Sequence, residues 1–194
     1  AEENDALVIV DEIQSGFGRT GKLFAYQHYD IEPDLVVCGK GISGSLPLSA
    51  VLGRGVLIEL DPTLTSTHGG HPISCAASLG NLEFFEKMDL VNKSNVLGQK
   101  LYQWLIEWKN QYPHRIHSIL GNGMVWAVFI SKEGSNSLDA NYTDQLVERA
   151  MQKGVYSIRT GCGTLKLGPP LTIPQDVLKE SIEVYKECMY EMEK

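Results

Sequence analysis

Two short apolar segments, both rich in β-branched residues, constrain the fold of this chain more than any other feature. Residues 6–10 end directly at Asp11, and residues 35–38 are followed by Lys40, which lies between two glycines. Near-continuous apolar runs of this length are typical of strands buried on both faces of a parallel sheet. Ligands of open α/β sheets bind beyond the carboxyl ends of the strands, so we expect Asp11 and Lys40 to share one site.

Strand and helix patterns alternate along the next part of the chain. Residues 46–52 form a further apolar run, which predicts a strand returning alongside residues 35–38. From residue 73 the pattern is helical, with apolar residues at three- and four-residue steps, namely Ala76, Ala77, Leu79, Leu82 and Phe85. A second helix is predicted over residues 95–108, with one apolar face formed by Leu97, Leu101, Leu105 and Trp108.

Shorter elements follow after residue 120. A turn at residues 121–123 precedes a predicted strand over residues 124–130, and a helix over residues 143–153 ends at a glycine. The remaining predicted elements are two short strands and a closing helix, at residues 155–158, at residues 164–167 and from residue 174 onward. This pattern is typical of a small α+β domain. We therefore expect residues 1–92 to belong to a larger α/β domain and residues 93–194 to form a small one.

Composition and charge narrow the functional classes. The chain has 194 residues, a net charge of −7 and no basic patch, which argues against a nucleic-acid partner. No apolar stretch approaches the length of a membrane span. The four cysteines show no close pairing, so we expect reduced thiols in a cytoplasmic protein. Because the chain begins with Ala1, only a few residues before a predicted buried strand, we expect it to be the C-terminal portion of a longer polypeptide.

Three other motifs give weaker signals. Residues 39–44 match the G-x-G-x-x-G pattern of dinucleotide-binding folds, but an extended pattern follows where a helix should begin. Residues 16–22 are too short for a Walker loop and lack a hydroxyl residue after the lysine. His68 and His71 do not predict a metal site, because the intervening glycines exclude a helix and no further ligands accompany them. Thr67, ahead of the helix from residue 73, suits a phosphate, although such hydroxyls also serve as helix caps.

The functional prediction rests on four residues taken together, namely Asp11, Gln14, Lys40 and Thr67. A lysine that forms a Schiff base, with an aspartate facing a ring nitrogen, is the minimum set of groups for pyridoxal phosphate chemistry. The chain resembles the class III, pyridoxal-phosphate-dependent aminotransferases in residues 8–21, 33–36, 39–41, 46–48, 67–70 and 169–171. This resemblance covers nearly the whole chain. It implies an α/β chain of fold type I, with part of the large mixed-sheet cofactor domain and the whole small C-terminal α+β domain.

The resemblance implies a role for each of these residues. Lys40 would form the Schiff base with pyridoxal 5'-phosphate and then transfer a proton between the substrate and the cofactor. Asp11 would face the pyridine nitrogen and keep it protonated, and Gln14 would contact the phenolic oxygen. Thr67 would reach the phosphate of the neighbouring subunit's cofactor, which implies a homodimer with shared active sites.

The sequence also departs from the family pattern. His71 stands where the family usually has asparagine, and Ser43 and Ser45 interrupt a stretch that is normally richer in glycine. Lys166 precedes the Pro-Pro motif, where many members carry an arginine that binds the substrate carboxylate. Lysine cannot form the bidentate fork of arginine, so Lys166 either binds a carboxylate as a point charge or the substrate has none there. Arg159 is the alternative substrate-binding cation, and both residues can equally be ordinary surface cations.

We therefore expect a transaminase that moves an amino group from a primary amine or amino acid to a 2-oxo acid. One alternative is an amino-acid racemase or epimerase of the same family, in which the lysine returns the proton to the substrate carbon. Another is a non-catalytic relative that keeps the fold for binding, although the presence of both Lys40 and Asp11 argues against it. The family's phosphate-cradling loop and ring-stacking aromatic residue would lie before Ala1, so the chain alone is expected to be inactive.

Overall fold

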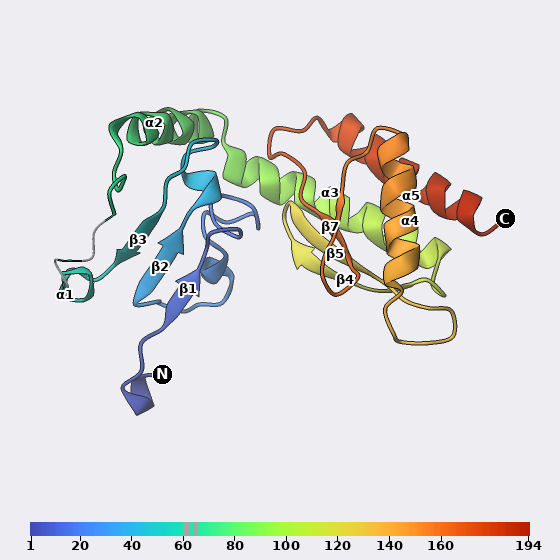
Figure 1. Ribbon diagram of the computed structural model, residues 1–194, viewed down its shortest axis with the longest axis horizontal. Helices are drawn as coiled ribbons and strands as arrows, with labels where there is room; N and C mark the ends of the chain where they lie inside the picture. Colours follow the sequence, from blue (N-terminus) through green and yellow to red (C-terminus); the bar gives the residue numbers. More distant parts are fainter. Residues whose placement is uncertain (60–62, 64–65) are drawn as a thin grey trace. The chain divides into compact units, whose positions relative to one another are not determined.

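The computed structural model describes residues 1–59, 63 and 66–194 (Figure 1). They divide into two compact units, Ala1–Asn92 and Lys93–Lys194. Each unit combines helices with a sheet, in agreement with the predicted α/β class. Among the described residues, no helix is both long enough and apolar enough to cross a lipid bilayer.

The first unit contains a three-stranded sheet in the order β1-β2-β3, formed by Ile9–Asp11, Leu35–Cys38 and Ala50–Gly53. β1 and β2 are parallel, as the two apolar runs predict, and Asp11 lies opposite Val37. β3 returns antiparallel to β2. β1 begins later than predicted because the Val8 N–H donates to the Asp34 carboxylate (2.8 Å) instead of to a neighbouring strand.

Within the described residues, the two faces of this sheet are buried to different extents. Val36 of β2 is buried, whereas Ile9 on the opposite face is 60% exposed and Val51 is half exposed. A parallel strand is buried on both faces only when a layer covers each of them. The described chain covers one face, and the row formed by Asp11, Val37 and Val51 lies on the open one.

The helices of the first unit are short, apart from one. The short ones are η1 (Glu2–Asn4), η2 (Ala25–His28), η3 (Lys40–Ile42) and α1 (Gly55–Ile58). The longer helix is α2 (Pro72–Lys87). α2 begins within one residue of its predicted start. The His71 ring nitrogen Nδ1 accepts a hydrogen bond from the Ile73 N–H (3.3 Å) and thereby caps α2, as an asparagine at this position would.

The buried face of α2 differs from the predicted one. Phe85 is buried as expected, but Leu79 is 63% exposed, whereas Ser74 and Ser78 are buried. This face contacts η3, whose backbone carbonyls need hydrogen-bond donors. The Ser78 hydroxyl donates to the Ile42 carbonyl at 2.8 Å. A polar rather than an apolar stripe is therefore buried along this part of the helix.

The second unit is built on an antiparallel sheet in the order β4-β5-β7-β6. The strands β4, β5, β6 and β7 are Ile116–Asn122, Val125–Ile130, Ile158–Arg159 and Leu165–Leu167. The helices α3, α4 and α5 are Leu90–Gln111, Ala140–Gln152 and Gln175–Met192. Sequence analysis missed β4, because a register shift between Ile116 and Ser118 breaks the alternation of apolar and polar residues.

Apolar residues from the sheet and from three helices form the core of the second unit. Alternate residues of β5 point into this core. The predicted apolar face of α3 is confirmed, since Leu101, Leu105 and Trp108 are fully buried. The Trp108 ring stacks on the Tyr185 ring of α5, with centroids 5.5 Å apart. One continuous apolar core thus joins α3, α5 and the sheet.

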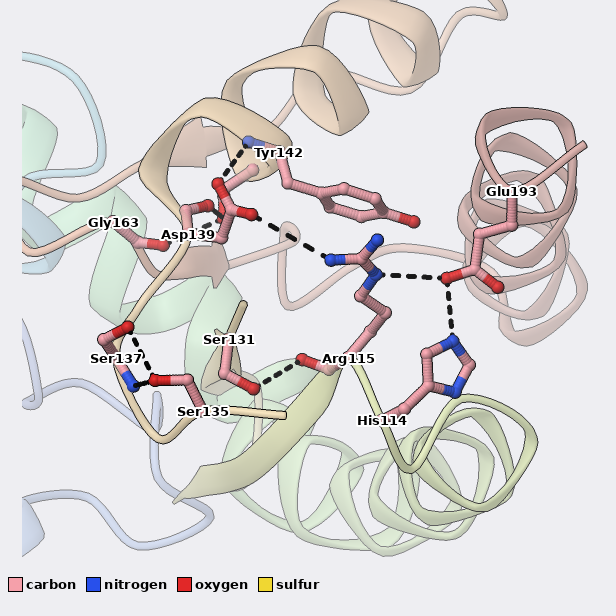
Figure 2. A network of polar contacts seen from close by, with 10 residues as sticks. His114, Arg115, Ser131, Ser135, Ser137, Asp139, Tyr142, Gly163 and Glu193 are labelled. Atoms are coloured by element: carbon pink, nitrogen blue, oxygen red, sulfur yellow. Dashed lines mark hydrogen bonds and ion pairs between the residues drawn. The ribbon is translucent and has the colours of Figure 1, made fainter. Parts of the chain in front are cut away.

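A network of polar contacts around Arg115 connects the ends of one strand and two helices in the second unit (Figure 2). The Arg115 guanidinium lies 3.2 Å from the Glu193 carboxylate and 4.5 Å from the centroid of the Tyr142 ring. His114 Nε2 also contacts Glu193, at 3.0 Å. The Asp139 side chain accepts a hydrogen bond from the Tyr142 N–H (3.0 Å) and caps α4. The network therefore joins the start of β4, the start of α4 and the end of α5.

Tyr185 makes the stability of the second unit sensitive to alkaline pH. Burial raises the pKa of its phenol to about 12, whereas an unfolded tyrosine titrates near pH 10. The titration of Tyr185 therefore leaves the free energy of unfolding unchanged below about pH 10. As the pH rises toward 12, it lowers this free energy by about 2–3 kcal/mol. Thermal unfolding measured between about pH 9 and pH 11.5 should show a smaller loss of stability in Tyr185→Phe than in the wild type.

Tyr190→Phe is the matched control, because Tyr190 lies on the same helix and is exposed. This variant should follow the wild-type profile. If Tyr185→Phe loses as much stability at alkaline pH as the wild type does, the raised pKa of Tyr185 is not a determinant of that stability.

Candidate active site

Asp11 is the last residue of β1 and has an exposed side chain. Its Oδ1 atom accepts a hydrogen bond from the Ile13 N–H at 2.9 Å, which orients the carboxylate. No hydrogen bond to Oδ2 occurs within the described part of the chain. Asp11 shares the open face of the sheet with Val37 and Val51. A flat ring placed on this face would meet apolar side chains next to an available carboxylate oxygen.

Lys40 is the first residue of η3, just beyond the end of β2. Its φ is +40°, in the left-handed region that residues with a side chain seldom adopt. Such conformations are unfavourable and cluster at functional sites. The Lys40 side chain is exposed and forms no ion pair with any described residue. Because Asp11 pairs with Val37 of the adjacent parallel strand, Asp11 at the end of β1 and Lys40 just beyond β2 lie at the same edge of the sheet.

The two glycines beside Lys40 are explained by close approach of the segment that follows Asp11. A Cβ atom at Gly39 would lie 3.2 Å from Ile13 Cγ2, and one at Gly41 would lie 2.9 Å from Phe17 Cβ. Real Cβ atoms essentially never lie within 3.0 Å of another carbon, so Gly41 in particular leaves no room for a side chain. The chain after β1 therefore packs directly against the chain after β2.

Gln14 lies between Ile13 and Phe17, in the segment that packs against the chain around Lys40. Its side chain is exposed. The structure thus brings Asp11 and Lys40 to one edge of the first unit's sheet, with Gln14 in the adjoining segment.

Glu12 is a buried residue whose role sequence analysis missed. Glu12 is only 2% exposed. Its carboxylate accepts hydrogen bonds from the Ser15 hydroxyl (2.5 Å) and from the Tyr26 N–H (2.8 Å). Burying a carboxylate is costly unless it is hydrogen-bonded in this way. Glu12 therefore holds the glycine-rich loop after β1 in place, behind Asp11. The one sequence signal for it is a charge directly after an apolar strand.

Cys38 lies close to Lys40 in sequence but is not a candidate nucleophile. Burial, together with the nearby negative charge of Glu12, raises the pKa of the Cys38 thiol. A buried neutral thiol is unreactive and packs as a small apolar group.

Thr67 is in a turn before α2 and is exposed. Among the described residues, it makes no hydrogen bond to Asp11, Gln14 or Lys40. It lies close in sequence to the N-terminus of α2, where unpaired backbone N–H groups and the helix dipole favour an anion.

Lys166 and Arg159 lie on opposite faces of the second unit's sheet. Lys166 pairs with Ile158 and Ala127, whereas Arg159 pairs with the fully buried Leu165. Directly opposed residues share a face, so Arg159 lies on the face that packs against the helices. Its guanidinium forms an ion pair with Asp144 of α4. Lys166 lies on the other face and forms no ion pair with a described residue, so the two cations cannot act at one site.

Comparison with known proteins identifies the family. The protein-family profile described as Aminotransferase class-III matches residues 1–189. The 4-aminobutyrate aminotransferase GabT of Escherichia coli (strain K12) is 36% identical over 195 residues, which cover 98% of this chain and 46% of that protein. The acetylornithine aminotransferase of Synechocystis sp. is 32% identical over 97% of this chain and 43% of that protein. The chain therefore belongs to the class III aminotransferase family.

Solved structures agree with this assignment. An aminotransferase from Bacillus anthracis matches with a TM-score of 0.90 and 30% identity, over 98% of this chain and 46% of that chain. The ornithine aminotransferase of Toxoplasma gondii matches with a TM-score of 0.88 and 28% identity, over 99% of this chain and 45% of that chain. The predicted fold of type I is thereby confirmed. The chain spans about half the length of the relatives that it matches.

Class III aminotransferases depend on pyridoxal phosphate, and the groups at this sheet edge fit that cofactor. The exposed amine of Lys40 is available for a covalent bond with an aldehyde. Asp11 Oδ2, which has no partner in the described chain, can accept a hydrogen bond from a protonated ring nitrogen. Val37 and Val51 offer an apolar surface beside that carboxylate.

Gly41→Ala tests whether the packing of Phe17 holds this edge together. The new Cβ should displace Phe17 or the backbone at Lys40, and lower the free energy of unfolding by about 1–3 kcal/mol. Urea or thermal unfolding of the complete native protein measures this. Gly161→Ala is the control, because no heavy atom lies within 4 Å of a Cβ there. In a double-mutant cycle, Phe17→Ala should cost less in the Gly41→Ala background, and strictly additive effects would contradict the proposed contact.

Proposed function

We propose that the complete protein is a transaminase that moves an amino group from a primary amine or amino acid to a 2-oxo acid. One observation carries this proposal. In a chain of the class III family, Asp11 ends β1 and Lys40 follows the adjacent parallel strand β2, and the segments after the two strands pack directly together. The named relatives described above are all aminotransferases, which supports transamination.

Three residues of this chain supply the chemistry at the cofactor. When bound, pyridoxal phosphate provides an aldehyde that joins to amines and a ring that accepts electrons. Lys40 Nζ would bind the cofactor covalently, and would afterwards accept the proton from the substrate carbon and deliver it to the cofactor. Asp11 Oδ2 holds a proton on the ring nitrogen, because its negative charge raises the pKa of that nitrogen. Gln14 donates a hydrogen bond to the phenolic oxygen and orients the ring.

Thr67 acts in this proposal at a second copy of the site. Its hydroxyl and the N-terminus of α2 bind the phosphate of the cofactor that the neighbouring subunit holds. The position of Thr67 just before α2, where an anion is favoured, supports this assignment, and the resemblance to the family supports a homodimer with shared active sites. All four cysteines are free, and two of them are buried, which agrees with a reducing cytoplasm.

The two units have separate tasks in the proposed enzyme. Ala1–Asn92 is the C-terminal part of the large cofactor-binding domain, and Lys93–Lys194 is the small domain. Lys166 contributes the cation for a substrate carboxylate, because its ammonium is unpaired among the described residues. Arg159 is the weaker candidate for this role, since its guanidinium is paired with Asp144.

Reductive trapping tests the assignment of Lys40. The complete native protein, supplied with pyridoxal phosphate, should gain a visible absorbance band that changes when an amine is added. Borohydride should then fix the mass of the reduced cofactor on the peptide that contains Lys40. Lys40→Ala should abolish the trapped mass, whereas Lys87→Ala, at the exposed end of α2, should not. A wild-type protein that stays colourless would refute the proposed function. A trapped mass on another lysine would refute the assignment of Lys40.

Substitution of Lys166 tests carboxylate recognition. Lys166→Gln should raise KM about tenfold for an ω-amino acid donor, because a charged hydrogen bond is lost. It should leave KM unchanged for the alkylamine of the same length, which has no carboxylate. Steady-state kinetics with both donors separates the two effects. If Arg159→Gln produces this selectivity change and Lys166→Gln does not, the substrate cation is Arg159.

A further inference from the structure

The chain that follows Lys40 is hydrogen-bonded to α2 through two side chains that the chemistry above does not use. Asn81 Nδ2 donates to the Gly41 carbonyl at 2.8 Å and lies 3.5 Å from the Ile42 carbonyl. One turn earlier on the same helix face, the Ser78 hydroxyl donates to the Ile42 carbonyl at 2.8 Å. The first two carbonyls after Lys40 are therefore both bound by α2.

The Asn81 side chain also lies close to Gly44, in the turn formed by residues 41–44. Gly44 has a φ of +75°, and a Cβ atom placed there would lie 2.8 Å from Asn81 Oδ1. On the far side of the turn, the buried Ser43 hydroxyl donates to the Leu46 carbonyl. The polar groups of this turn are thus engaged with each other and with α2. We call residues 39–46 the Lys40 loop.

The backbone of Lys40 needs such support, because its φ of +40° is unfavourable for a residue with a side chain. A conformation of this kind persists only when its surroundings determine it from several sides. Phe17 packs against Gly41 from the side of β1, and Ser78 and Asn81 bind the loop carbonyls from α2. Without the bonds from α2, the loop can relax toward the ordinary helical region and turn the lysine side chain away.

We infer that Ser78 and Asn81 are positioning residues for Lys40: by binding the carbonyls of Gly41 and Ile42, they hold the strained backbone that directs Nζ toward the substrate. This inference rests on the proposed role of Lys40. Neither side chain touches the reacting atoms, so both act through the backbone of the Lys40 loop. Loss of either one should impair proton transfer more than substrate binding.

Three variants of α2 test the inference in the complete, cofactor-loaded protein. Asn81→Leu keeps the shape of the side chain and removes its donor, Ser78→Ala removes the hydroxyl, and Ser74→Ala is the control. Ser74 is as buried as Ser78, at 7% each, and makes no hydrogen bond to the Lys40 loop. The first two variants should lower kcat about tenfold with KM within about twofold, and Ser74→Ala should match the wild type.

A spectroscopic titration separates positioning from a general loss of stability. The visible band of the bound cofactor can be titrated with pH before substrate is added, and it responds to the geometry of the lysine that holds the cofactor. In Asn81→Leu and Ser78→Ala the midpoint of this titration should differ from the wild-type midpoint, because the lysine that joins the cofactor is no longer held in one geometry. Unchanged midpoints and kcat, or an equal change in Ser74→Ala, would overturn the inference. If Asn81→Leu does not fold, Asn81→Asp, which keeps the shape and places an acceptor against two carbonyls, should give the same loss of kcat.

Hydrogen exchange of the cofactor-free protein provides a readout that does not depend on the proposed function. The Ile42 N–H bonds to the Gly39 carbonyl at 3.1 Å, and peptides covering the Lys40 loop should exchange faster in Asn81→Leu and Ser78→Ala than in the wild type. Faster exchange with an unchanged titration would mean that α2 stabilises the loop but does not position Lys40. If the wild-type protein never binds the cofactor, the proposed function fails, and the exchange experiment alone still tests the hydrogen bonds to α2.

Discussion

Direct packing between the segments that follow β1 and β2 is the contact on which the candidate site depends. Ile13 lies against Gly39, and Phe17 lies against Gly41, so both glycines that flank Lys40 are contact points. Parallel pairing of the two strands brings the segments together, and the absence of side chains at the glycines lets them approach. Asp11 and Lys40 are therefore held by short-range packing, although twenty-eight residues separate them in sequence.

The two units achieve their order by different means. The second unit has a continuous apolar core in which α3, α5 and the sheet pack with fully buried side chains. Around the candidate site the first unit instead buries polar groups, including the Glu12 carboxylate and the carbonyls of the Lys40 loop, and pairs each with a donor. Buried polar groups add little net stability, but they impose one specific geometry because an unpaired group is costly. That property suits a segment that must hold one lysine in an unfavourable backbone conformation.

Sequence patterns succeeded where an element is long or strongly periodic. The stripe of α3 and the helix that begins after Pro174 were predictable because their apolar residues repeat with the helical period. β4 escaped prediction because a register shift interrupts its alternation. The buried face of α2 was assigned wrongly because its partner is a turn with exposed carbonyls, which selects Ser78 over Leu79. Sequence reasoning likewise could not separate Lys166 from Arg159, since strands of two or three residues are too short to define their faces by periodicity.

By itself the sequence determined that Asp11 and Lys40 end two apolar strands, and it carried the motifs that mark the class III family. These are local properties, and local patterns of apolar residues and glycines express them directly. Only the tertiary structure decided which polar groups meet: Ser78 and Asn81 reach carbonyls 36 to 40 residues earlier in the chain. Periodicity shows that a face is buried, but the partner that buries it is chosen by the packing of distant segments, which no local pattern encodes.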